Sequence, residues 1–149
     1  MQRRLMDILA DPDNPDYWPL KLEIFKSEIR EREKLPHPHD NGILCKFYCH
    51  QQDKFLVTDP LGENEQSLSK DEIDHITVLQ NCYECIKEEI IDGILYHLRE
   101  EKIKWFIIDR EIPVMFPIDL RDVKQERKFI SNYEADCAKL KIIKPEKIS

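Results

Sequence analysis

Four of the five cysteines stand in two closely spaced pairs, a pattern that can bind a metal ion. Three residues separate Cys45 from Cys49, and two residues separate Cys82 from Cys85. Four cysteine thiolates form a common tetrahedral site for structural zinc. However, the first pair falls on an expected strand, which would place its members about 13 Å apart, and the second pair falls within an expected helix. We therefore predict no metal and treat the thiols as small buried hydrophobic groups, with zinc as the weaker alternative.

Acidic side chains at the ends of expected strands form a second candidate site. Asp59 follows one apolar segment, and Asp109 and Glu111 follow another. Carboxylates that converge can hold Mg²⁺ and activate water, as a metal-dependent phosphodiesterase or nuclease requires. In this alternative function the three acids are catalytic, and Lys104 or Arg110 orients the scissile phosphate.

Two histidines and two aromatic residues are weaker candidates for a binding site. His37 and His39 flank a proline in a rigid turn, where imidazoles can bind a transition metal or exchange a proton. Tyr17 and Trp18 lie between prolines and could anchor an interface. Histidines in a charged turn are more often solvated, and aromatic residues more often belong to a core.

The glycines and serines exclude several common catalytic sites. Gly42, Gly62 and Gly93 stand far apart, whereas a loop that holds phosphate groups needs glycines close together. The chain has no G-x-S-x-G sequence, which marks a nucleophilic serine in many hydrolases. We therefore predict no cofactor and favour a function that is not enzymatic.

The charge balance indicates what kind of partner suits the chain. It carries 23 Lys and Arg against 30 Asp and Glu, a net charge of -7. Such a charge opposes broad binding to nucleic acid or to an anionic membrane, and favours a basic protein partner. An odd number of cysteines without an export signal or an apolar membrane segment predicts a cytoplasmic protein.

Hydrophobic periodicity predicts elements that segregate into helices and a small sheet. We expect a helical turn over 2–9, a helix over 16–34, a hairpin over 43–58, a long central helix over about 69–100, a strand over 103–108, an extended edge segment over 112–118, a helix beginning at Asp122, and a short strand over 140–143. The predicted fold is α+β, with a mainly antiparallel sheet of three to five strands packed against helices. We divide the chain into an arm (1–15), one domain (16–144) and a charged tail (145–149).

These observations favour a small acidic binding or regulatory module, of the adaptor, inhibitor or immunity type. Its partner is expected to be a larger and basic protein, because an acidic surface attracts such a partner at long range. The sequence leaves open whether the chain also forms a homo-oligomer.

Overall fold

A four-stranded antiparallel sheet is the centre of the molecule. The computed structural model describes residues 1–32, 44–58, 66–67, 79–142 and 144–145. The strands lie in the order β1 (Lys21–Ile29), β6 (Glu88–Arg99), β7 (Lys102–Asp109) and β8 (Ile112–Val114). Each pair of neighbours is antiparallel. The predicted α+β class, with a small and mainly antiparallel sheet, is confirmed.

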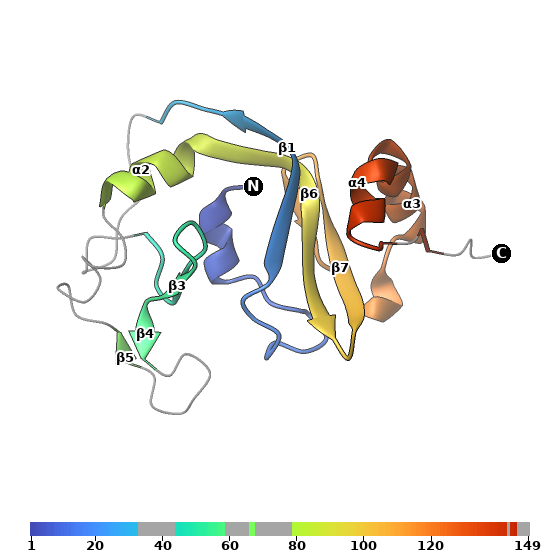
Figure 1. Cartoon of the computed structure of the whole chain (residues 1–149), viewed down its shortest axis with the longest axis horizontal. Coiled ribbons are helices and arrows are strands. Elements are labelled where there is room, and N and C mark those ends of the chain that lie inside the picture. Colours follow the sequence, from blue (N-terminus) through green and yellow to red (C-terminus); the bar gives the residue numbers. More distant parts are fainter. Residues whose placement is uncertain (33–43, 59–65, 68–78, 143, 146–149) are drawn as a thin grey trace.

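The two faces of this sheet are covered by opposite ends of the chain. The 3-10 helix η1 (Arg3–Asp7) and its neighbours cover one face, where Met1, Met6 and Leu20 are buried with side chains of β6 and β7. Helices α3 (Val123–Asn132) and α4 (Glu134–Lys139) cover the other face, as Figure 1 shows. The sheet is therefore apolar on both sides.

Strand β7 shows how a continuous apolar segment serves both faces. Trp105 and Ile107 pack toward α3 and α4, whereas Phe106 and Ile108 pack toward the N-terminal segment. Successive side chains of a strand point to opposite faces, so a strand covered on both sides needs no polar alternation. The predicted strand over 103–108 is confirmed.

The long central helix predicted over about 69–100 is wrong. In the part of this range that the structure describes, only α2 (Leu79–Lys87) is helical, and the chain continues directly into β6 (Figure 1). Gly93 lies inside β6, and a Cβ atom at this position would lie 2.5 Å from the backbone oxygen of Glu23 on β1. The glycine therefore permits close approach of two strands rather than bending a helix.

The helix predicted over 16–34 is also wrong, because residues 21–29 form the edge strand β1. Leu22 and Ile24 pack on the N-terminal side of the sheet, but Phe25 packs on the side of α3. Successive side chains of a strand point to opposite faces, so a strand between two apolar layers can carry apolar residues at both even and odd positions. The register of β1 against β6 also shifts after Ile24. Apolar residues on both faces, together with the exposed Ile29, produce a spacing that resembles one helical face.

The hairpin predicted over 43–58 is present only in a short form. Strands β2 (Tyr48–Cys49) and β3 (Lys54–Phe55) pair across a turn, whereas β4 (Val57–Thr58) pairs with β5 (Gln66–Ser67). Before β2 the chain bends, and the carboxylate of Asp7 accepts three backbone N–H bonds there, from Lys46, Phe47 and Tyr48. The N-terminal segment therefore sets the shape of this bend.

The C-terminal part mostly follows the prediction. Strand β8 lies at the edge of the sheet, as its Pro113 requires, and the 3-10 helix η2 (Ile118–Leu120) follows. The side chain of Asp122 accepts a hydrogen bond from the backbone N–H of Gln125 and caps α3, as expected. The short strand predicted over 140–143 is wrong for residues 140–142, which form a turn and its exit after α4, and residue 143 lies outside the described residues.

Candidate binding surface

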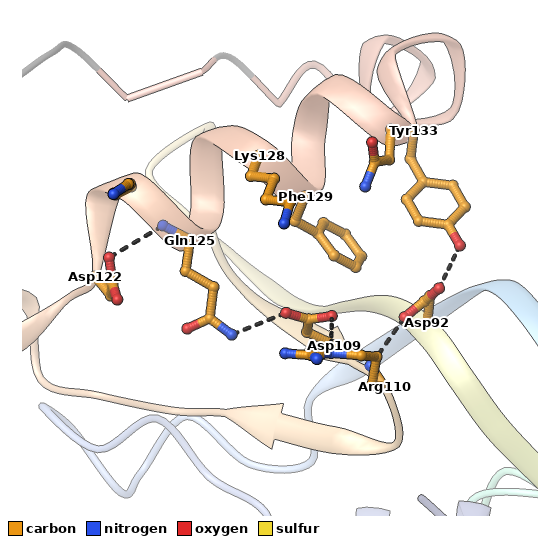
Figure 2. Close-up of a pocket in the computed structure, with 10 residues that line it drawn as sticks. Asp92, Asp109, Arg110, Asp122, Gln125, Lys128, Phe129 and Tyr133 are labelled. Atoms are coloured by element: carbon orange, nitrogen blue, oxygen red, sulfur yellow. Dashed lines mark hydrogen bonds and ion pairs between the residues drawn. The ribbon is translucent and has the colours of Figure 1, made fainter.

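The predicted strand-end acid Asp109 lines a cleft of about 630 Å³ between β6, β7 and α3. Figure 2 shows Asp92 of β6 on the same side of the cleft as Asp109, both facing helix α3. Gln125 donates to Asp109 Oδ2 at 2.9 Å, and the hydroxyl of Tyr133 donates to Asp92. The backbone N–H of Arg110 also donates to Asp92, at 3.0 Å. These carboxylates therefore connect helix α3 to the end of the sheet.

The protonation of Tyr133 agrees with this structural role. Burial, followed by the hydrogen bond to Asp92, raises the pKa of Tyr133 to about 12. The phenol therefore stays a neutral donor at physiological pH.

The other two predicted strand-end acids are Glu111 and Asp59. Glu111 forms an ion pair with Arg30, in the segment that follows β1, and Asp59 lies outside the described residues. The structure thus directs Asp109 and Glu111 to different partners.

A second charged cluster lies at the other end of the sheet. Lys104 Nζ lies 2.7 Å from Asp11 Oδ1 and 2.8 Å from Asp13 Oδ2. Nε2 of the buried His97 lies 2.7 Å from the other oxygen of Asp11. Burial raises the pKa of Asp11, but hydrogen bonds from Lys104, the Asp13 backbone and His97 outweigh it and lower the pKa. This cluster fixes the N-terminal loop on β6 and β7.

Tyr17 and Trp18, the predicted interface anchors, are half-buried and have partners within the chain. The ring of Tyr17 stacks on His97 with centroids 4.3 Å apart. The indole N–H of Trp18 donates to the backbone oxygen of Asp7, and its ring contacts Phe47. Their contacts hold the N-terminal loop, and His37 and His39 lie outside the described residues.

The connection between β8 and α3 exposes three large apolar side chains. Phe116, Ile118 and Leu120 are 46%, 64% and 69% exposed, and we call them the apolar row. The backbone N–H of Ile118 donates to the Asp13 carboxylate, which fixes the middle of the row. At its end, Arg121 donates to the backbone oxygen of Trp105, so the row lies on an ordered segment.

An apolar groove lies close to this row. Its volume is about 590 Å³, and its apolar lining comes from Leu98, Ile103, Trp105 and Leu140. The guanidinium of Arg121, next to Leu120 in the chain, lies 4.4 Å from the centre of the Trp105 ring. Exposed acids accompany this surface: Glu100, Glu101 and Asp119. Lys102 and Lys141 also line the groove, so the surface combines exposed apolar groups with charges of both signs.

The four paired cysteines come together in a separate part of the molecule. Cys45, Cys49 and Cys82 are buried in one small cluster with Leu44, Leu56 and Ile86. Cys85 lies one helical turn beyond Cys82 on α2 and is half-buried. The remaining cysteine, Cys137, is buried between α4 and the sheet. None of the five forms a disulfide.

Comparisons with known proteins add no family or relative. No family model, curated protein or solved structure matched the chain. Within the described residues, no three His, Cys, Asp or Glu side chains are arranged to hold a metal ion. None of the helices in those same residues is long and apolar enough to cross a membrane.

Sequence reasoning missed both the apolar row and the cluster around Asp11. The row follows Pro113 and contains Pro117, and its first two members belong to the predicted extended edge segment, although three large apolar residues on a short connection are a visible signal. No sequence signal connects Asp11 with His97, because 86 positions separate them and their meeting depends on the strand order.

Proposed function

We propose that this chain is a small acidic protein-binding module that docks on a larger basic protein through the apolar row and the adjacent groove. The observation that carries the proposal is the exposure of three large apolar side chains on one ordered connection. Apolar surface of this kind contributes binding free energy when a partner removes it from water.

The ordered backbone of the row favours binding. Hydrogen bonds at Ile118 and Arg121 already hold this connection against the N-terminal loop and β7. A partner would therefore not have to order the segment, so less of the binding free energy is lost as conformational entropy. The groove beside it offers a recess for an apolar side chain of the partner.

The charge of the chain favours a basic partner. The net charge of -7 attracts a cationic surface over distances comparable to the screening length of the solution. Beside the apolar groups, Glu100, Glu101 and Asp119 are exposed acids that outnumber the groove-lining Lys102 and Lys141. In this arrangement the acids accelerate association, and the apolar groups hold the complex once it forms.

The contacts of the strand-end acids agree better with binding than with catalysis. Asp109 accepts a hydrogen bond from Gln125, and Glu111 forms an ion pair with Arg30. Both side chains thus contribute to holding elements together. The phosphodiesterase alternative needs Asp109 and Glu111 to turn toward one metal ion instead.

Affinity purification with matched variants tests the proposal. Tagged wild type, an Ile118→Ser/Leu120→Ser variant and an Ile8→Ser/Ile29→Ser control are incubated with extract of the source cells. The control removes two exposed isoleucines that lie elsewhere, 65% and 69% exposed. Proteins retained by the wild type are then purified, and their affinities for all three chains are measured at low and high salt.

We expect a basic protein that binds the wild type and the control equally and more weakly at high salt. The Ile118→Ser/Leu120→Ser variant should lose at least about tenfold in affinity, as central apolar contacts usually do. Equal affinity of this variant, or an affinity unaffected by salt, would contradict the proposal.

A further inference from the structure

The bend before β2 places Cys45 and Cys49 in one buried cluster, which a straight strand would not do. A straight strand would separate these residues by about 13 Å. Instead, the backbone N–H groups of residues 46, 47 and 48 all point to the carboxylate of Asp7, at 2.6 to 2.8 Å. A segment with three consecutive N–H groups directed at one carboxylate is curled, so both thiols can face the same cluster.

Helix α2 supplies the second pair of thiols. Cys82 and Cys85 are three residues apart, so they are neighbours on one side of the helix. Side chains with this spacing provide metal ligands in helical bundles, where one helix contributes two ligands three residues apart. Cys82 belongs to the same buried cluster as Cys45 and Cys49.

Cysteines make up half of the side chains that this cluster holds among the described residues. These are three aliphatic side chains and three cysteines, whereas the clusters on the two faces of the sheet are mainly aliphatic and aromatic. The strands beside it, β2 and β3, are two residues each. Small units of this kind are commonly stabilised by a disulfide or a metal ion, and the cysteines form no disulfide.

The thiols also influence one another electrostatically. Cys45 lies close enough to the other three thiols to interact with them, and Cys85 lies close enough to Cys49 and Cys82. A divalent cation among them would stabilise their thiolate forms.

We propose that Cys45, Cys49, Cys82 and Cys85 bind one zinc ion, which joins the bend before β2 to helix α2. Four Zn–S bonds form, and the four thiol protons pass to the solvent. Since these thiols do not yet surround one point, binding includes their rotation toward a common centre. The ion would be structural, and the proposal is independent of the partner proposed above.

Metal analysis of the purified chain tests this site. The protein is produced in medium with added zinc, separated from loosely bound metal, and analysed for zinc per chain. A second sample is unfolded, stripped with a chelator and refolded with Co²⁺ alone, and its absorption spectrum is recorded. We expect about one zinc per chain and the intense thiolate-to-cobalt absorption of a tetrahedral site.

Two single variants locate the ion. Cys85→Ser removes a half-buried ligand and should lose the zinc and the cobalt absorption. Cys137→Ser removes a buried thiol from the core between α4 and the sheet and should keep both. Retention of zinc by Cys85→Ser, or its loss from Cys137→Ser with a folded sheet, would overturn the assignment.

Measurements on the unmodified chain keep the test decisive if a variant fails to fold. A thiol reagent added stepwise should release the zinc as the four paired thiols react, with one thiol left over. The apparent zinc affinity should fall as pH decreases, because protons compete for the thiolates. A wild-type chain that holds no zinc and shows no cobalt absorption would refute the proposal.

Discussion

The ammonium group of Lys104 lies 2.7 Å from a carboxylate oxygen of Asp11, whose side chain is only 2% exposed. Replacing Lys104 by Met removes this ion pair and leaves a buried carboxylate whose remaining side-chain partner is His97. We expect Lys104→Met to lower the free energy of unfolding by about 2 to 3 kcal/mol. Urea unfolding measures this value, and Lys102→Met at an exposed neighbouring position should change it by less than about 0.5 kcal/mol.

The same pair predicts how stability depends on pH. Because the pKa of Asp11 is lowered below its ordinary value of 3.8, its contribution is present above that value and is lost as pH falls through the folded pKa. Urea midpoints of wild type and Asp11→Asn should therefore differ most near neutral pH and converge below about pH 4. A difference that stays constant down to pH 2 would contradict this account.

Lys104 gives the opposite dependence at high pH. Burial lowers its pKa, but the hydrogen bonds to Asp11 and Asp13 outweigh burial and raise it above 10.5. Its contribution is therefore complete below that value and is lost as pH rises through the folded pKa. The free energy of unfolding of the wild type should therefore fall as pH rises above 10.5. In Lys104→Met the free energy of unfolding should fall less over the same pH range, because the titrating ammonium group is absent.

Asp7 should control the bend before β2 without controlling the sheet. In Asp7→Ala, the backbone N–H groups of Lys46, Phe47 and Tyr48 lose the carboxylate that accepts them. Hydrogen exchange at these three amides should accelerate, while amides in the centre of β6 and β7 remain protected. Equal acceleration in both regions would show that the bend and the sheet unfold together.

Gly93 should not tolerate even a methyl group. A Cβ atom there meets the backbone oxygen of Glu23 at 2.5 Å, and β1 must move to relieve the contact. We expect Gly93→Ala to cost about 1 to 3 kcal/mol of unfolding free energy, the usual effect of forced overpacking. Ser27→Ala, at an exposed position of the neighbouring strand, is the control and should have little effect.

The sequence predicted those elements whose signals are local. The apolar segment at Trp105 was long enough for a strand and too short for a helix, and Asp122 carried a capping side chain at a helix start. The errors came from β1 and β6, where tertiary contacts decide the structure. Apolar residues on both faces of β6 and of β1 imitate helical spacing, and the need for a glycine at position 93 arises only from the close approach of β1.

The candidate surface was less predictable for a different reason. Whether Ile118 is exposed depends on how the other elements pack around it, and no local sequence pattern indicates that packing. The charge of the chain pointed to a basic partner without locating the contact. The cysteine spacing did identify residues that the fold brings together, although the expected straight strand argued against it.

The position of Trp105 makes the proposed docking surface optically observable. Its indole lines the groove, is 8% exposed and lies beneath the guanidinium of Arg121. A partner that displaces this guanidinium or fills the groove will change the polarity around the indole, and hence its fluorescence. Since the other tryptophan, Trp18, packs against Phe47 and Phe55 in the N-terminal part, a Trp18→Phe chain would carry a single intrinsic reporter. Complex formation could then be followed in real time without any attached dye.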